Sequence, residues 1–225
     1  MTTEGQINPK RIANDIKTME KSTSRKINFD YIVGDTLDKI TGIVFGTEDS
    51  CFDKHVFVFN ICLNNNYPFN PPKFHFVNLI QRRFHPNLYI DGKVCMTILN
   101  TWRDSKITGW MTAMNLESVL VSIQSMLDDN PIAQEPGQDK VPKTDERAKN
   151  YQIASRYNSL LNTFMYCKDQ SFGEVVKEYV LAHVANYEKQ IAMLKSHHNK
   201  SYSYFHGSVF VDVTQLENML AKICS

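Results

Sequence analysis

Residues 56–73 read VFVFNICLNNNYPFNPPK, and this stretch carries most of the information about the expected fold. Over Val56–Leu63, apolar residues occupy nearly every position on both faces of a period-two pattern, which is typical of a buried strand. Three prolines then follow within five residues, so Tyr67–Lys73 can form neither a helix nor a central strand. We therefore predict a buried strand that leads into a rigid, extended loop.

The neighbouring segments predict three further strands with no helix between them. Strand-like runs cover Phe29–Val33, Ile40–Phe45 and Lys73–Val77. Polar breaks at Gly34-Asp35 and Thr47–Asp53 separate the first strands as turns. Because such short connections cannot join parallel strands, the four strands are expected to form an antiparallel meander.

Helices are expected before and after these strands. The segment Asn8–Lys21 has apolar residues at i, i+4 and i+7, the spacing of one helix face: Ile12, Ile16 and Met19. Asn115 can cap a second helix. Its apolar residues repeat with the same period: Leu116, Val119, Leu120, Ile123, Met126 and Leu127. The fold class predicted from these patterns is α+β, with an N-terminal helix, a four-stranded antiparallel meander sheet and a central helix.

The C-terminal part of the chain is expected to be helical as well. The stretch 135–145 is rich in proline and charge, which is typical of a linker. Helical periodicity follows over residues 146–168 and 172–196. After a polar break at 196–201, a last short helix is predicted near 214–223.

Composition excludes several classes of function. The 225 residues carry 25 Lys+Arg against 24 Asp+Glu, so there is no overall charge to favour nucleic acid or an anionic membrane as partner. No run approaches the roughly 20 apolar residues of a membrane span, and the first residues, Met-Thr-Thr-Glu-Gly-Gln, lack a basic-then-apolar pattern, so no signal peptide is expected. The five cysteines are widely spaced without a CxxC pair, which favours a reducing compartment, cytoplasmic or nuclear. No metal-ligand cluster or nucleotide-binding glycine loop is present, so no bound cofactor is expected.

Chemistry is concentrated in residues 85–95, which read HPNLYIDGKVC. Cys95 follows a Gly-Lys turn, a position that favours partial exposure of its thiol. Lys93 and the pair Arg82-Arg83 are cations that can favour the thiolate, the reactive form of cysteine. The amide of Asn87 is a group that can stabilise an oxyanion during acyl transfer. These residue types make the segment a candidate site for nucleophilic catalysis.

The order of the motifs resembles the ubiquitin-conjugating enzymes. Tyr-Pro-Phe-x-Pro-Pro-Lys at Tyr67–Lys73 is followed by His-Pro-Asn at 85–87, by Cys95, and then by a tryptophan and a leucine-rich helix. The chain is most similar to long members that have an enlarged loop after the cysteine and a C-terminal helical extension, such as the one that works with the alternative ubiquitin-activating enzyme. The resemblance implies a catalytic core over 1–137 and an extension over 138–225.

The resemblance also implies roles for individual residues. Cys95 would accept the C-terminus of ubiquitin, or of a ubiquitin-like modifier, from an activating enzyme and hold it as a thioester. Asn87 would stabilise the oxyanion when a lysine attacks, or hold the loop that does so. His85 and Pro86 would brace this loop. Glu135 would orient or deprotonate the incoming amine, the alternative being an exposed charge in a linker. ATP would act only at the activating enzyme.

Docking positions follow from the same resemblance. Lys10 and Arg11 match basic positions on the first helix that dock the activating enzyme, and the alternative is an ordinary solvated helix face. Phe69 and Ala113 match the two loops where ligases bind. An exposed aromatic residue in a rigid loop is a suitable anchor for a protein partner, but a buried position for Phe69 stays open.

Two further features follow the cysteine in the sequence, an enlarged loop and a pair of tryptophans. The stretch Thr101–Gly109 is about seven residues longer than in minimal members of the family, and could gate the site or lie on the surface. Trp102 and Trp110 are both expected to be packing residues.

The sequence leaves two rival functions open. One is a binding module of the same fold that carries no ubiquitin, although an intact Cys95 with Asn87 argues against it. The other is a cysteine hydrolase with His85 as base, which is disfavoured by the absence of a glycine-rich oxyanion motif around Cys95.

Overall fold

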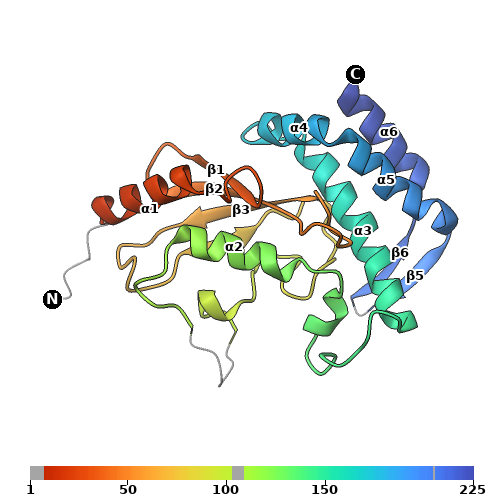
Figure 1. The fold of residues 1–225 in the computed structure, drawn as a ribbon, viewed down its shortest axis with the longest axis horizontal. Coiled ribbons are helices and arrows are strands. Elements are labelled where there is room, and N and C mark those ends of the chain that lie inside the picture. The colour runs from red at the N-terminus through yellow and green to blue at the C-terminus, as the bar shows by residue number, and fades with distance from the viewer. Residues whose placement is uncertain (1–7, 103–108, 205) are drawn as a thin grey trace. The chain divides into compact units, whose positions relative to one another are not determined.

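The structure is a computed structural model that describes residues 8–102, 109–204 and 206–225 (Figure 1). The chain divides into two compact units, which are described in turn. The first comprises Met1–Phe45, Phe57–Val77 and Asn87–Met126, and the second comprises Gly46–Val56, Asn78–Pro86 and Leu127–Ser225. The functional boundary predicted near residue 137 stays a prediction.

The first unit is built on the predicted meander. Its sheet has the order β1-β2-β3-β4, with the following bounds: β1 Phe29–Val33, β2 Lys39–Phe45, β3 Val56–Cys62 and β4 Lys73–Phe76. The pairs β1/β2 and β3/β4 are antiparallel, with Phe29 opposite Val44 and Phe59 opposite Phe76. The predicted α+β fold, with four strands in sequence order, is therefore confirmed.

Each of the two helices of this unit is capped by an asparagine side chain, of which Asn115 was predicted as a cap. In α1 (Pro9–Lys21) the side chain of Asn8 accepts a hydrogen bond of 3.1 Å from the Arg11 backbone N–H. In α2 (Leu116–Met126) the Asn115 side chain accepts one of 2.9 Å from the Ser118 backbone N–H. Both predicted helices are thus confirmed, and each presents its apolar residues to the interior.

Helix α2 packs closely on the sheet. A Cβ atom on Gly42 of β2 would lie 2.9 Å from side-chain carbons of both Ile61 in β3 and Leu120 in α2. A larger residue would require these side-chain ends to shift, so Gly42 favours a close approach of helix and sheet. Between β4 and α2, the described residues form one further element, a short 3-10 helix, η1 (Thr97–Leu99).

The second unit is mostly helical, with the following elements: η2 Pro131–Gln134, α3 Glu146–Tyr166, α4 Gly173–Ala182, α5 Val184–Leu194, η3 Lys195–His197, β5 Ser201–Tyr204, β6 Gly207–Phe210 and α6 Val213–Cys224. Helix α3 is the centre of this unit, because most of its residues from Ala154 onward are buried. The β5–β6 hairpin lies along α3 (Figure 1). No helix within the three described ranges is long and apolar enough to cross a membrane.

Two predictions for this unit were wrong. The single helix expected over 172–196 is broken at His183, whose φ of −124° and ψ of 22° are not helical. The His183 ring nitrogen Nδ1 lies 2.8 Å from the Tyr179 carbonyl oxygen, so the side chain bonds this carbonyl near the break. The residues around the polar break at 196–201 lead into the β5–β6 hairpin, which the sequence did not indicate.

Candidate active site

Cys95 and Asn87 are held together by two hydrogen bonds within the first unit. The Cys95 backbone N–H donates to the Asn87 carbonyl oxygen at 2.9 Å. In the opposite direction, the Asn87 side-chain amide donates to the Cys95 carbonyl oxygen at 2.6 Å. The two bonds fix the backbone at the cysteine relative to the asparagine. The structure therefore brings together the two residues that the sequence singled out first.

The loop between them is a tight hairpin-like turn. The backbone N–H of Tyr89 donates to the Lys93 carbonyl oxygen at 3.0 Å, and the backbone N–H of Gly92 donates to the Tyr89 carbonyl oxygen at 3.1 Å. Gly92 has a φ of +85°, and a Cβ atom there would lie 2.3 Å from the ring of His75. Glycine is thus required both for the backbone conformation and for the contact with β4. This turn sets the direction in which the chain reaches Cys95.

The thiol of Cys95 is less accessible than predicted. Cys95 is only 5% exposed, so the expectation of partial exposure was wrong. Thr101 lies next to the thiol, and its hydroxyl donates to the Val94 carbonyl at 2.7 Å and accepts from the Met96 N–H at 2.8 Å. These bonds bring the Thr101 carbonyl oxygen to 3.6 Å from the Cys95 sulfur.

The residues that follow Thr101, and Lys93 before the cysteine, also have predicted roles. Most of the enlarged loop lies outside the described residues, because 103–108 are not part of the described ranges. Trp110 packs as expected, with its ring 5.9 Å from that of Tyr67. Trp102 is 46% exposed, so the prediction that it is a packing residue was wrong. The Lys93 ammonium lies 5.4 Å from the Tyr89 ring centroid, and its effect on the thiol stays a prediction.

His85 and Pro86 belong to the second unit, where both are buried. The His85 ring is fully buried, with its centroid 5.7 Å from that of Phe52. The Arg83 guanidinium donates to the His85 carbonyl at 3.4 Å and also to the Pro86 carbonyl. This geometry is consistent with a bracing role and offers little support for His85 as a base that must reach a substrate.

Glu135 is a buried, hydrogen-bonded carboxylate in the second unit. It is 8% exposed, so the alternative of an exposed linker charge was wrong. The Tyr151 hydroxyl donates to its Oε1 atom at 2.9 Å, and His206 Nε2 hydrogen-bonds the same oxygen. Burial alone would raise the pKa of Glu135. The hydrogen bonds from His206 and Tyr151 outweigh this effect, so the pKa lies below its usual value. A role with the incoming amine stays a prediction.

Sequence reasoning missed Tyr151 and His206 as partners of Glu135. They lie 16 and 71 residues further along the chain. Tyr151 belongs to a small apolar cluster with Ile132 and Ala148, against which Tyr204 of β5 packs. No local sequence pattern indicates this cluster, because its members come from separate segments of the chain and meet only when the β5–β6 hairpin packs against α3.

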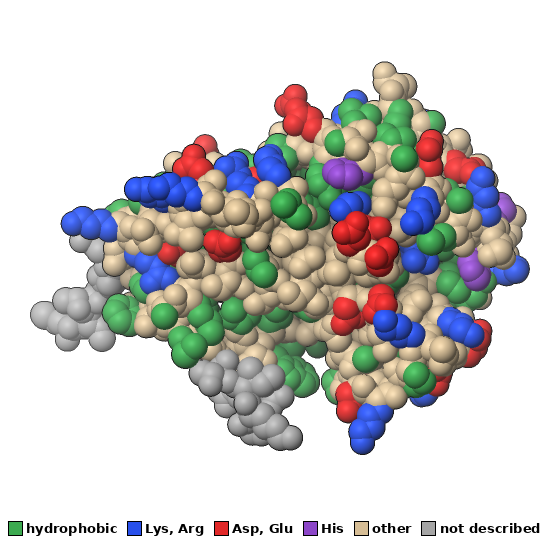
Figure 2. All heavy atoms as spheres, in the orientation of Figure 1, with side chains coloured by type: hydrophobic (Ala, Val, Ile, Leu, Met, Phe, Trp, Pro, Cys, Tyr) green, Lys and Arg blue, Asp and Glu red, His purple; other side chains and the backbone are tan. Residues whose placement is uncertain are grey.

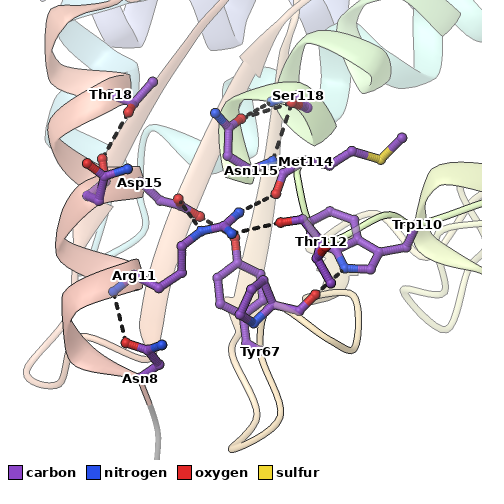
Figure 3. Close-up of polar contacts among 12 residues, drawn as sticks. Asn8, Arg11, Asp15, Thr18, Tyr67, Trp110, Thr112, Met114, Asn115 and Ser118 are labelled. Carbon is purple, nitrogen blue, oxygen red and sulfur yellow. Dashed lines mark hydrogen bonds and ion pairs between the residues drawn. The ribbon is translucent and has the colours of Figure 1, made fainter.

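The predicted docking residues differ in their surroundings. Lys10 is exposed on α1, where Figure 2 shows basic side chains gathered at the surface. Arg11 is turned toward the loop before α2 and bonded to it (Figure 3). Phe69 is 78% exposed, so the alternative of a buried position was wrong. Ala113 is exposed as well. The docking roles themselves stay predictions.

The fold has a counterpart among solved structures. The E2 domain of a ubiquitin conjugating enzyme from Toxoplasma gondii aligns with a TM-score of 0.51 and 22% sequence identity, covering 67% of this chain and 95% of that one. At this identity the match establishes the fold alone. The helix, four-stranded meander and central helix of the first unit are thus those of a ubiquitin-conjugating domain.

Sequence comparison establishes the family. Residues 11–161 match the family model described as ubiquitin-conjugating enzyme, and the chain belongs to this family. Ubiquitin-conjugating enzyme E2 Z of Homo sapiens is 33% identical over 156 residues, which cover 67% of this chain and 42% of that protein. Probable ubiquitin-conjugating enzyme protein 17 of Caenorhabditis elegans is 30% identical over 184 residues, covering 76% and 25%. The chain therefore spans less than half the length of either relative.

Proposed function

We propose that this chain is an active ubiquitin-conjugating enzyme that carries ubiquitin, or a ubiquitin-like modifier, on Cys95. The observation that supports this most directly is the reciprocal pair of hydrogen bonds between Asn87 and Cys95. These bonds hold the backbone that carries the thiol and place an asparagine amide beside it. A fixed backbone suits a nucleophile, because attack is favoured when the reacting atoms are held in a defined geometry.

The proposed reaction has two transfers. In the first, the Cys95 thiolate attacks the thioester carbonyl carbon of the activating enzyme's ubiquitin conjugate. A carbon–sulfur bond to Cys95 forms, and the activating enzyme's sulfur leaves as a thiolate. In the second, a substrate lysine amine attacks the new thioester, its proton passes to a base, and Cys95 leaves as the thiolate; transfer to a ligase cysteine is the other route. ATP is consumed only at the activating enzyme, and no bound cofactor is proposed.

Asn87 and Glu135 have proposed parts in the second transfer. The Asn87 amide donates to the Cys95 carbonyl, which supports the role of holding the loop, with donation to the oxyanion as the other role. The lowered pKa of Glu135 keeps this residue ionised at neutral pH, which supports orienting an amine; deprotonation of the amine is the other role, for which a lowered pKa makes the carboxylate a weaker base.

The partners are proposed from the exposed residues. Lys10 on α1 would dock the activating enzyme, and Phe69 with Ala113 would contact the ligase. The working site would lie in a reducing compartment, cytoplasmic or nuclear, because Cys95 must stay a free thiol and is one of five free cysteines.

A second function is a binding module of the same fold that carries no ubiquitin. The observation that favours it is the low exposure of Cys95, whose sulfur lies 3.6 Å from the Thr101 carbonyl oxygen. Loading would then require the segment after the cysteine to move.

A loading assay decides between the two functions. The chain is incubated with ATP, ubiquitin or a ubiquitin-like modifier, and each of a panel of activating enzymes. The proposed function predicts an adduct that is cleaved by thiol, is lost in Cys95→Ala and becomes thiol-resistant in Cys95→Ser, where an oxyester replaces the thioester. Cys62→Ala, which removes an exposed cysteine, is the matched control and should load normally. If no adduct forms with any combination of activating enzyme and modifier, the binding module is left as the function.

A further inference from the structure

The guanidinium of Arg11 joins helix α1 to the loop that precedes α2 (Figure 3). Its Nε atom lies 2.8 Å from a carboxylate oxygen of Asp15, one turn further along α1. Its Nη1 atom donates to the Thr112 carbonyl at 2.8 Å, and its Nη2 atom donates to the Met114 carbonyl. All of these groups belong to the first unit. One planar group thus holds both ends of a three-residue segment centred on Ala113.

Asp15 and Tyr67 keep this guanidinium in place. Asp15 is 2% exposed, and a buried carboxylate must be paired and hydrogen-bonded to be tolerated. Its second oxygen accepts a hydrogen bond from the Tyr67 hydroxyl. The Arg11 guanidinium carbon also lies 5.4 Å from the centroid of the Tyr67 ring. Burial, together with the neighbouring Asp15, raises the pKa of Tyr67, so its hydroxyl stays a donor.

The same cluster reaches the loop that carries Phe69. Tyr67 is two residues before Phe69, and its ring lies 5.9 Å from that of Trp110. The Trp110 indole N–H donates to the Pro68 carbonyl at 2.7 Å. The backbone on the N-terminal side of Phe69 is therefore tied, through Tyr67 and Trp110, to the segment that Arg11 holds.

We infer that Arg11 is a positioning residue for the surface formed by Phe69 and Met111–Met114, which the proposed function assigns to the ligase. This inference rests on that proposed function for the identity of the partner, but the positioning itself rests on the contacts above. Because the Thr112 and Met114 carbonyls both point to the guanidinium, Ala113 between them is left exposed on a fixed backbone. A loop held in this way loses less conformational entropy on binding.

This role differs from docking by charge, which the resemblance implies for the same residue. Lysine would preserve the positive charge at position 11 but not the planar set of donors that meets three acceptors at once. Arg11→Lys therefore separates the two roles. The adjacent Lys10 is exposed, so Lys10→Ala tests charge at the helix surface without touching the cluster. Lys17→Ala, also exposed on α1, is the matched control.

The deciding measurement is amide hydrogen exchange in the full chain. The Met114 backbone N–H donates to the Met111 carbonyl at 2.9 Å and reports the order of the loop. Loss of the guanidinium bonds in Arg11→Lys should speed exchange of this amide about tenfold, while Lys17→Ala leaves it unchanged. Tyr67→Phe, which removes only the hydroxyl bonded to Asp15, should give a smaller change in the same direction. Equal Met114 exchange in Arg11→Lys and Lys17→Ala would overturn the inference.

A functional measurement then tests the consequence for the ligase. Discharge of the loaded chain is measured against the concentration of an isolated RING-type ligase domain that stimulates the wild type. Arg11→Lys should raise the half-saturating concentration about tenfold, with ligase-free discharge of the loaded chain unchanged. An equal loss of ligase-free and ligase-stimulated discharge would indicate a merely structural role and contradict the inference. If the wild type did not load, the proposed function would fail, whereas the exchange measurement would still decide whether Arg11 positions the loop.

Discussion

The side-chain amide of Asn87 lies 2.6 Å from the carbonyl oxygen of Cys95, while the Cys95 backbone N–H lies 2.9 Å from the carbonyl oxygen of Asn87. Each residue therefore acts as donor and acceptor toward the other. This reciprocity means that a change at Asn87 alters the backbone on which the thiol is carried. It also means that the side-chain bond can be removed while the backbone bond is left intact.

Asn87→Ala removes only the side-chain half of this pair. We expect loading to persist, because the thiol and the backbone bond remain. Discharge to free lysine should slow by about 100-fold if the amide serves the oxyanion. Single-turnover discharge measures this, with the exposed Asn65→Ala as the matched control. Equal discharge rates in the two variants would refute a role for the Asn87 amide in the second transfer.

Gly92→Ala should destabilise the first unit. Alanine at this position must adopt a φ of +85° and place its Cβ 2.3 Å from the His75 ring. We expect a loss of about 2–3 kcal/mol in the free energy of unfolding, measured by urea denaturation. The double variant Gly92→Ala/His75→Ala should recover the part due to the contact and keep the part due to backbone strain.

Gly137 provides the control for Gly92→Ala and for the double variant. Its φ is +78°, but nothing lies within 4 Å of a Cβ built there. Gly137→Ala should therefore show the strain alone, about 1 kcal/mol. An equal loss in Gly92→Ala and Gly137→Ala would contradict the importance of the His75 contact.

Glu135→Gln should lower stability in a pH-dependent way. The folded pKa of Glu135 lies below its unfolded value of about 4.3, so the carboxylate stabilises the fold above that pH. This stabilisation is lost as the pH falls through the folded pKa. At pH 7 the variant should lose about 1–3 kcal/mol, because Tyr151 and His206 no longer face an ionised acceptor.

The comparison is made by denaturant unfolding between pH 7 and pH 3. The difference in unfolding free energy between wild type and Glu135→Gln should shrink below about pH 4. The exposed Glu178→Gln on α4 should change stability by less than about 0.5 kcal/mol throughout. A difference that stays constant over this range would show that the ionised carboxylate is not what the cluster needs.

Alkylation should distinguish the cysteines of the native chain. Burial raises the pKa of the Cys51 thiol to about 12, whereas Cys62 and Cys224 are exposed. At pH 8 the thiolate fraction of Cys51 should be about a thousandfold below that of an ordinary cysteine. Mass-spectrometric mapping after brief iodoacetamide treatment should find Cys62 and Cys224 modified and Cys51 intact. Early labelling of Cys51 would contradict its buried position.

The first unit was largely predictable because its signals are local. Alternation in Val56–Leu63, the prolines after it and the cap Asn115 each specify their own segment, and the observed elements begin within a residue of the expected ones. Asn87 and Cys95 are eight residues apart, with a Gly-Lys turn between them. Their contact follows from one short loop, so residue types and spacing were sufficient to pair them.

The second unit was less predictable because its contacts are long-range. Ser201–Tyr204 is only four residues long, too short to indicate a strand on its own, and it pairs with Gly207–Phe210 while Tyr204 packs on the cluster of Ile132, Ala148 and Tyr151. The burial of Glu135 depends on partners that come from α3 and from the hairpin. The side-chain bonds that place Thr101 beside Cys95 are likewise not indicated by any spacing rule.

The contact between Thr101 and the Cys95 sulfur gives this chain an optical reporter of its own. An acyl group on the sulfur would need the space in which the Thr101 carbonyl lies at 3.6 Å. Trp102 follows directly, is 46% exposed and donates its backbone N–H to Met96 at 3.3 Å. Displacement of Thr101 would change the solvent around this indole. Intrinsic tryptophan fluorescence should therefore follow loading and discharge in real time, without a label on either protein.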